Sequence, residues 1–217
     1  MHESRSQPPD ALLLTAQGCS YCAGMKTILN KLYGEGLLKR FEEVDVAEHP
    51  EIAARYGVRS VPWLALGPFH LQGMHSETDI RTWLKRLDTD DATQEYYRQL
   101  LLDGDLDQVM AMMGNDPAGL FDLLALAAAP DLDLKLRLGI SAVFEAFEGK
   151  PELQALSCEF IKLASHDQAS VRADAAHYLS LTHDRAVVAV LRTLAADPDR
   201  EVREVAEDAL AELDDDR

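Results

Sequence analysis

The sequence is poor in cysteine, in long apolar runs and in positive charge, and each shortage narrows the class of protein. Three cysteines among 217 residues are too few for a disulfide framework, which favours a reducing compartment. The longest apolar run, residues 123–129, falls far short of the ~20 residues that span a bilayer. No secretory apolar segment follows the N-terminal residues. We therefore expect a cytoplasmic protein without a membrane partner.

Positive charge is scarce mainly in the second part of the chain. Residues 1–88 carry 10 Lys and Arg against 11 Asp and Glu, whereas residues 89–217 carry 11 against 27. Two compositions in one chain predict two domains. The acidic part should repel phosphate groups, because nucleic-acid binding depends on Lys and Arg. We expect no nucleic-acid partner.

The first part alternates strand and helix patterns. After residues 1–10, which we expect to be disordered, residues 11–88 should form one α/β domain. Strands are expected at 11–15, 44–46, 63–66 and 69–71, and helices at 20–33, 51–56 and 76–87. Ser76 and Asp79 have the spacing of a capping box at the start of the last helix.

Two cysteines, Cys19 and Cys22, lie between the first strand and the first long helix, in the sequence Cys-Ser-Tyr-Cys. A thiol at a helix N-terminus faces unpaired backbone N–H groups and the positive end of the helix dipole, which favour the thiolate. The spacing lets the second thiol resolve a mixed disulfide. We expect Cys19 to be the exposed, attacking cysteine and Cys22 the buried, resolving one.

Two other interpretations of this pair remain open. The cysteines could be incidental on a helix, or they could be half of a metal or iron–sulfur site completed by a second subunit. No second pair with this spacing exists, and the seven histidines lack the spacing of metal ligands. We therefore expect neither a metal nor another cofactor.

A proline at the start of an apolar strand, Pro62 after Val61, suits a strand end or a cis turn. Together with the cysteine pair, residues 44–46 and 50–62 and Gly73, it resembles the thioredoxin superfamily. The resemblance covers about residues 11–87. It implies a thioredoxin-like fold, a cis Val61–Pro62 bond against the cysteine pair, and substrate binding beside these two residues.

The chain departs from the family at several positions. Gly18 stands where thioredoxins usually carry Trp, and Leu13 replaces their buried Asp. The Cys-Ser-Tyr-Cys motif and the small size of the domain are closer to glutaredoxins, yet residues 15–17 lack the lysine of that family.

The second part of the chain shows helical patterns without strand signals. A linker is expected at 89–93, connecting helices at 94–116, helical repeats at 117–213 and an acidic tail at 214–217. An apolar residue followed by Arg137, Arg172 or Arg203 recurs at steps of 35 and 31 residues, each time after an acidic turn. The pattern resembles HEAT repeats and implies an all-α solenoid.

Each repeat is expected to place an apolar helix before the turn, at 118–128, 152–164 and 186–195. The turn aspartate can cap the following helix, and the arginine can reach an acid in a neighbouring turn. The remaining distinctive side chains are predicted to be packing residues: Trp63, Trp83, Met110, Met112, Met113 and Cys158.

Three functions fit these features. The first is a thiol–disulfide oxidoreductase that exchanges electrons between a protein disulfide and a dithiol donor, with the acidic repeats recruiting a protein with a basic surface. The second is a chaperone-like or adaptor protein with redox regulation. The third is a glutaredoxin-like glutathione or iron–sulfur carrier. The sequence favours the first.

Overall fold

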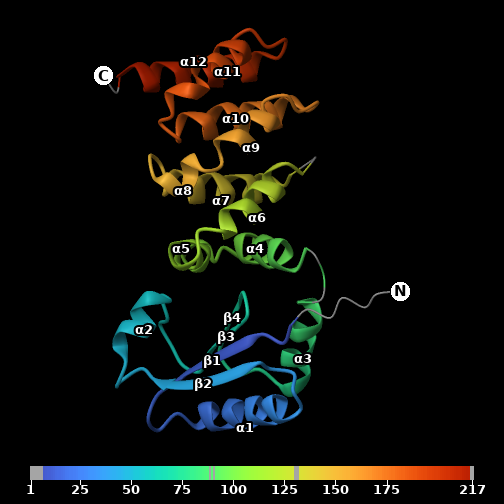
Figure 1. Ribbon diagram of the computed structural model, residues 1–217, viewed down its shortest axis with the longest axis vertical. Coiled ribbons are helices and arrows are strands. Elements are labelled where there is room, and N and C mark those ends of the chain that lie inside the picture. Colours follow the sequence, from blue (N-terminus) through green and yellow to red (C-terminus); the bar gives the residue numbers. More distant parts are fainter. Residues whose placement is uncertain (1–6, 88, 90, 130–131, 216–217) are drawn as a thin grey trace. The chain divides into compact units, whose positions relative to one another are not determined.

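A leucine-rich strand, β1, is one of the two central strands of a four-stranded sheet (Figure 1). β1 (Asp10–Thr15) pairs in parallel with β2 (Arg40–Asp45) and antiparallel with β3 (Trp63–Leu66). β4 (Phe69–Gln72) pairs antiparallel with β3, which gives the order β2-β1-β3-β4. This mixed sheet confirms the predicted α/β class of the first part of the chain.

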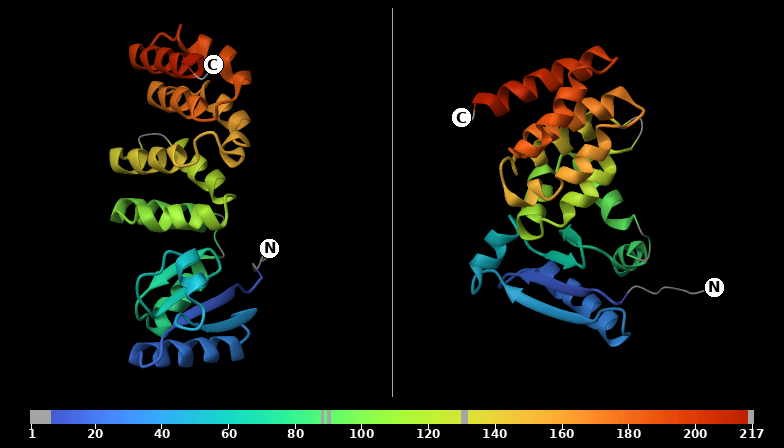
Figure 2. Two further views of the ribbon diagram at one scale, coloured as in Figure 1. Left: turned by 90° about the vertical axis from the view of Figure 1, so that its left-hand side faces the viewer. Right: turned by 45° about the horizontal axis from the view of Figure 1, so that its top comes forward.

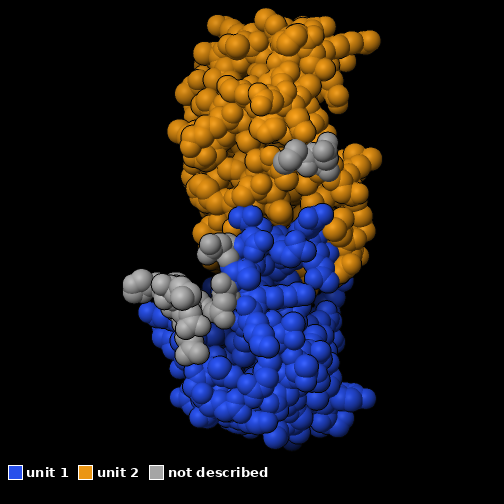
Figure 3. All heavy atoms as spheres, turned by 90° about the vertical axis from the view of Figure 1, so that its right-hand side faces the viewer, with its two compact units in different colours: residues 1–99 blue, residues 100–217 orange. Residues whose placement is uncertain are grey.

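The computed structural model describes residues 7–87, 89, 91–129 and 132–215, and the chain divides into two units, residues 1–99 and residues 100–217 (Figure 3). Predictions that concern residues 1–6, Asp90, Asp131 or residues 216–217 lie outside the described residues. Among the helices that are described, none is both long and apolar enough to cross a membrane.

Two helices cover one face of the sheet. α1 (Ser20–Gly34) buries Cys22, Met25, Leu29 and Leu32, and this face of the sheet contributes Leu13 and Leu64, both fully buried. α3 (Glu77–Arg86) begins at the predicted capping box of Ser76 and Asp79. Salt bridges join the two helices, from Lys31 to Glu77 at 2.8 Å and from Arg81 to Glu35 at 2.5 Å.

The opposite face of the sheet is covered by a shorter helix. α2 (Pro50–Arg55) and the turn after it pack Ile52 and Tyr56 against a cluster of Leu14, Val44 and Trp63. Because side chains alternate along a strand, Leu13 and Leu14 point to opposite faces and are both inaccessible to solvent. The central strand is therefore buried on both sides.

The outer edge of β4 is closed by a tyrosine. α4 (Ala92–Asp103) starts inside the predicted linker, and its Tyr96 hydroxyl donates to the His70 carbonyl at 2.6 Å and accepts from the His70 N–H at 2.9 Å. The Tyr96 ring packs on Phe69 and Trp83. An edge strand exposes unpaired backbone groups, so these bonds protect β4 from pairing with another chain.

The second unit is helical (Figure 2). Its elements after α4 are α5 (Leu106–Asn115), α6 (Gly119–Ala127), α7 (Leu134–Glu145), α8 (Pro151–Gln154), α9 (Ser157–Leu163), α10 (Ala169–Ser180), η1 (Arg185–Val187), α11 (Val188–Leu194) and α12 (Arg200–Asp215). The rings of Phe144, Phe160 and Tyr178 meet in its core with centroids 4.8 to 5.5 Å apart. Met112 and Met113 are buried, as predicted.

Two of the predicted helices are interrupted. The segment 152–164 is divided between α8 and α9, and the segment 186–195 between η1 and α11. At the first break the Ser157 hydroxyl donates to the Gln154 carbonyl at 2.7 Å, a local bond that competes with the helical backbone pattern. At the second, Asp184 accepts from the Ala186 N–H at 2.9 Å and starts a tight 3₁₀ turn.

The repeated arginines make repeated contacts. Arg172 donates to the carbonyls of His166 and Asp167, and Arg203 makes the equivalent bonds to Asp197 and Pro198. Arg172 also binds both carboxylate oxygens of Asp197 at 2.8 Å, which confirms that an arginine reaches an acid in the next turn. These matching contacts agree with a repeat organisation.

The first arginine and the caps follow the pattern less regularly. Arg137 pairs at 3.3 Å with Asp174, which lies in helix α10 and not in a turn. Asp133 and Asp199 cap α7 and α12, as predicted. α10 begins after Gln168, whose side chain makes no capping bond.

Arg172→Met tests the stabilising contribution of these contacts. The variant leaves the carboxylate of Asp197, only 8% exposed, without its bidentate partner, and should lower the free energy of unfolding by about 2 kcal/mol. The hydrogen bond from Arg172 lowers the pKa of Asp197, so this stabilisation is present at neutral pH and is lost as the pH falls through that lowered pKa. Urea unfolding followed by circular dichroism at 222 nm measures the change.

Arg200→Met is the matched control, because Arg200 forms an exposed ion pair with Glu204 on α12. We expect no measurable change in stability from it. Equal effects of the two variants at neutral pH would contradict the role assigned to Arg172.

Candidate functional site

The turn after β1 places Cys19 at the first position before α1. Gly18 has a φ of +80°, a conformation that favours glycine, and the Cys19 N–H bonds to the Ala16 carbonyl at 3.2 Å. Cys19 is the N-cap residue of α1, and its sulfur accepts the Cys22 N–H at 3.2 Å. The sulfur therefore lies at the helix N-terminus, where backbone donors and the helix dipole stabilise negative charge.

Cys19 and Cys22 form a disulfide, with their Cα atoms 5.4 Å apart. Cys22 is 4% exposed, whereas Cys19 is half-buried. Tyr21, between them, is exposed over 66% of its surface. The difference in access agrees with the order of roles predicted for the two cysteines.

The Val61–Pro62 peptide bond is cis, as predicted. In the antiparallel register of β1 and β3, Leu14 pairs with Trp63, so the next position places Pro62 opposite Thr15. Thr15 is the end of β1 that leads to Cys19. The register therefore brings the proline to the same end of the sheet as the cysteine pair.

A glycine fixes the carbonyl of this proline. The Gly73 N–H bonds to the Pro62 carbonyl at 2.9 Å, and Gly73 has a φ of +86°. A residue with a side chain would be strained in this conformation. Gly73 thus links the chain after β4 to the proline turn.

Leu13 gives the side of β1 that faces α1 an apolar side chain and no carboxylate. Leu13 is fully buried and pairs in register with Glu43 of β2. Glu43 forms an ion pair with Lys26 of α1 at 2.5 Å. Lys26 lies one helical turn beyond Cys22, so this pair bridges helix and sheet near the disulfide. No sequence pattern predicts this pair, because nothing local joins residues 26 and 43.

An aromatic group lies on the other face of the sheet. The ring of Trp63 lies 5.1 Å from the ring of Tyr56 and 4.9 Å from that of His70. Burial lowers the pKa of His70 to about 4, because the charged imidazolium loses its hydration there. Trp63 is 4% exposed, which confirms it as a packing residue directly after Pro62.

The prediction that Cys158 is a core residue is wrong. Cys158 is exposed on α9, whereas its neighbours Ser157 and Phe160 are buried. The buried residues Leu153, Leu156, Ser157 and Phe160 recur at helical spacing, and Cys158 lies off the face that they form. Cys158 is a free thiol outside the disulfide.

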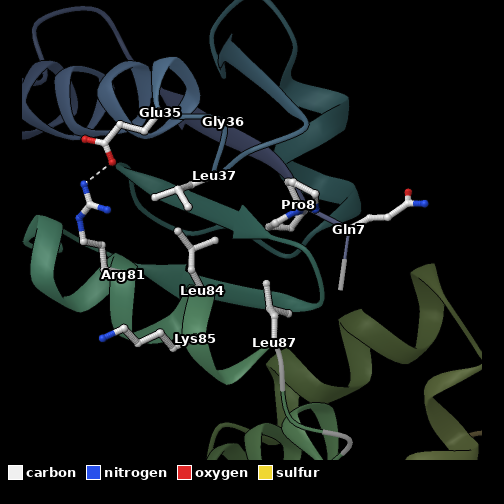
Figure 4. A pocket seen from close by; sticks show the side chains of 10 residues that line it. Gln7, Pro8, Glu35, Gly36, Leu37, Arg81, Leu84, Lys85 and Leu87 are labelled. Carbon is white, nitrogen blue, oxygen red and sulfur yellow. Dashed lines mark hydrogen bonds and ion pairs between the residues drawn. The ribbon is translucent and has the colours of Figure 1, made fainter. Parts of the chain in front are cut away.

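Two further features lie apart from the disulfide. A cavity of about 610 Å³ adjoins the other end of α1 and is lined by Glu35, Leu37, Arg81, Leu84 and neighbouring residues (Figure 4). Within the described part of the chain, no group of three or more His, Cys, Asp or Glu residues is arranged to hold a metal ion.

Residues 12–85 match a family model described as a thioredoxin domain. The match, the four-stranded mixed sheet and the disulfide at the start of α1 together define a thioredoxin-like domain in the N-terminal unit. A largely helical region follows it. No curated protein matches the chain.

His70→Gln should reduce the acid sensitivity of the N-terminal unit. In the unfolded chain His70 takes up a proton below about pH 6.5, whereas in the folded chain it stays neutral down to about pH 4. Stability is therefore lost as the pH falls through this window, by as much as about 3 kcal/mol.

Tryptophan fluorescence can follow this effect, because both tryptophans, Trp63 and Trp83, belong to the N-terminal unit. Below about pH 6.5 the free energy of unfolding should fall more steeply with acidity in the wild type than in the variant. Above that pH the two pH dependences should be the same. Identical pH profiles between pH 4 and 6.5 would show that His70 is not responsible.

Proposed function

We propose that the protein is a thiol–disulfide oxidoreductase that uses Cys19 and Cys22. The observation that carries the proposal is the disulfide at the start of α1, with the Cys19 sulfur on a helix amide and Cys22 buried behind it. The thioredoxin domain match over residues 12–85 supports it. We place the reaction in the cytoplasm, where thiols are kept reduced.

In the reductive direction, the Cys19 thiolate attacks one sulfur of a protein disulfide. A bond forms between Cys19 and that sulfur, the substrate S–S bond breaks, and the other substrate sulfur leaves as a thiolate. The Cys22 thiolate then attacks Cys19, forming the Cys19–Cys22 disulfide and releasing the second substrate thiolate. The substrate gains two electrons and two protons, and a dithiol donor returns the same number to the protein.

The substrate chain is proposed to lie as an added strand beside Val61 and Pro62. Pro62 has no N–H, and its carbonyl already accepts the Gly73 N–H. The backbone hydrogen bonds to a substrate would therefore come from Val61. In this proposed arrangement the substrate would lie at the end of β1 that leads to Cys19.

Alkylation identifies the attacking cysteine. In the reduced Cys158→Ser variant at mildly acidic pH, iodoacetamide should label Cys19 before Cys22, because Cys19 is half-buried at the helix start and Cys22 is 4% exposed. The Cys158→Ser background removes the exposed third thiol. Peptide mass spectrometry reads the order of labelling, and faster labelling of Cys22 reverses the assignment.

Trapping separates the candidate functions. Cys22→Ser in the same background should retain substrates as mixed disulfides on Cys19, and Cys19→Ser should retain none. A visible chromophore after anaerobic purification would instead favour the glutathione or iron–sulfur carrier. Suppression of aggregation that survives loss of both cysteines would favour the chaperone-like adaptor.

The helical unit is proposed to be a HEAT-like solenoid that recruits a protein with a basic surface. Support comes from the repeated contacts of Arg172 and Arg203 and from the net charge of −16 in residues 89–217. α10 and α12 enclose a groove of about 340 Å³ with no Lys or Arg in its lining. Its acidic residues are Asp174, Glu201, Asp208 and Glu212.

This groove is suited to basic side chains. Asp174 pairs with Arg137 at 3.3 Å, so the basic side chains of a partner are proposed to meet Glu201, Asp208 and Glu212. Between the carboxylates lie Ala173, Val205 and Ala209, which can contact the methylene stems of Lys or Arg. Negative charge over such a surface also raises the association rate with a basic partner.

Charge neutralisation on α12 tests the recruitment. Asp208→Asn with Glu212→Gln removes two charges from the groove, and should lower the association rate of the trapped partner about tenfold at low salt. Glu204→Gln with Glu207→Gln removes two charges from the same helix outside the groove and is the control. Stopped-flow rates at about 0.02 M and 1 M salt are compared, because screening suppresses steering at 1 M. Rates for both double variants equal to the wild-type rate at low salt would leave the charge with a role in solubility alone.

A further inference from the structure

The cavity beside the C-terminal end of α1 is lined by three segments of the N-terminal unit (Figure 4). They are the residues just before β1, the turn after α1 and the helix α3. The volume of about 610 Å³ is within the range of about 300–1,000 Å³ that is typical of small-molecule sites. Neither Cys19, Cys22 nor Pro62 belongs to the described lining, so a ligand here would bind apart from the disulfide.

Backbone hydrogen bonds and close packing hold one end of this cavity in shape. The Lys39 N–H donates to the Pro9 carbonyl at 2.9 Å, and the Gly67 N–H donates to the Asp10 carbonyl at 3.0 Å. A Cβ on Gly67 would lie 3.3 Å from Pro9 and 3.5 Å from Leu87, so both residues pack over this glycine. The end of the cavity formed by Pro9 and Leu87 therefore exists before any ligand binds.

One part of the lining is apolar. Figure 4 shows Leu84 and Leu87 pointing from α3 toward Leu37 and Pro8. Leu37 is 37% exposed, and Leu84 and Leu87 are only partly buried. The leucines therefore leave apolar surface in contact with water, and a ligand with an apolar body would remove that surface from water.

The charged part of the lining and its ion pairs contain one more cation than anion. The Arg81 Nε and Nη2 donate to Glu77, and Nη2 also donates to Glu35 at 2.5 Å. Lys31 binds Glu77 as well. Among the described residues, neither the Nη1 of Arg81 nor the Nζ of Lys85 has a hydrogen-bond partner. Lys85 follows Arg81 by one helical turn, so the two unused donors lie on the same face of α3.

We propose that this cavity is a binding site for a small amphipathic carboxylate, a molecule with one carboxylate group and an apolar chain. The two carboxylate oxygens accept hydrogen bonds from the Nη1 of Arg81 and the Nζ of Lys85. The apolar chain lies between Leu37 and Leu84 and leaves water together with them. Because Glu35 and Glu77 already hold the guanidinium of Arg81, it loses little freedom when the ligand binds. The site does not depend on the proposed oxidoreductase function.

Titration of the full-length protein with decanoate tests the proposal. Isothermal titration calorimetry should show saturable binding of one decanoate per chain. Decanamide has the same apolar chain but no charge, and should bind about tenfold more weakly because it loses the charge-assisted hydrogen bonds. Hexanoate keeps the carboxylate but has a shorter chain, and should also bind at least about tenfold more weakly.

Three variants assign the binding to this cavity. Lys85→Gln should weaken decanoate binding about tenfold and leave decanamide binding unchanged, because only the carboxylate uses the ammonium group. Leu37→Asn should weaken both ligands, because it makes the apolar wall polar. Lys162→Gln removes an exposed lysine from α9 in the helical unit and should keep the wild-type affinities.

Amide chemical shifts locate the ligand on the protein. In ¹H–¹⁵N spectra, decanoate should shift the amides of residues 35–37 and 81–87 more than those of the rest of the chain. No binding to the wild type up to about 1 mM decanoate would overturn the proposal. So would equal affinities for decanoate and decanamide, an unchanged affinity in Lys85→Gln, or shifts concentrated outside these residues.

Discussion

Burial of β1 on both faces is the constraint on which the N-terminal unit depends. Leu13 is covered on the side of α1 and Leu14 on the side of α2, so the strand has a single position in the sheet. Its end then delivers the Gly18 turn and Cys19 to the start of α1. Its register with β3 brings Pro62 to the same end. The geometry of the disulfide site thus follows from the packing of one apolar strand.

The second unit is stabilised by a different combination of interactions. Phe144, Phe160 and Tyr178 form an apolar core between successive helices. Arg172 pairs with Asp197 and donates to two carbonyls of its own turn. The electrostatic repulsion between the acidic turns is therefore weaker than their aspartates alone would cause. Three carboxylates of α12, those of Glu201, Asp208 and Glu212, line the groove beside α10.

Local patterns predicted most of the fold, because strands, caps and turns depend on neighbouring residues. The strand Trp63–Leu66, the capping box at Ser76 and the cis bond at Pro62 all have signals within a few residues. The errors depend on distant contacts or on local competition. Cys158 is exposed because it lies off the buried face of Leu156, Ser157 and Phe160, and Tyr96 closes β4 from 26 residues away. The cavity beside α1 and α3 could not be predicted, since its lining comes from three segments that are far apart in the sequence.

The most direct test of the account is a single turnover without any external reductant. The Cys158→Ser protein is reduced, freed of reductant and mixed with a protein disulfide, and the products are alkylated and weighed by mass spectrometry. The account predicts that each molecule that reduces one substrate disulfide acquires one Cys19–Cys22 disulfide. Reduction of the substrate without that disulfide, or no transfer between the two, would contradict the claim that these cysteines exchange electrons with a protein.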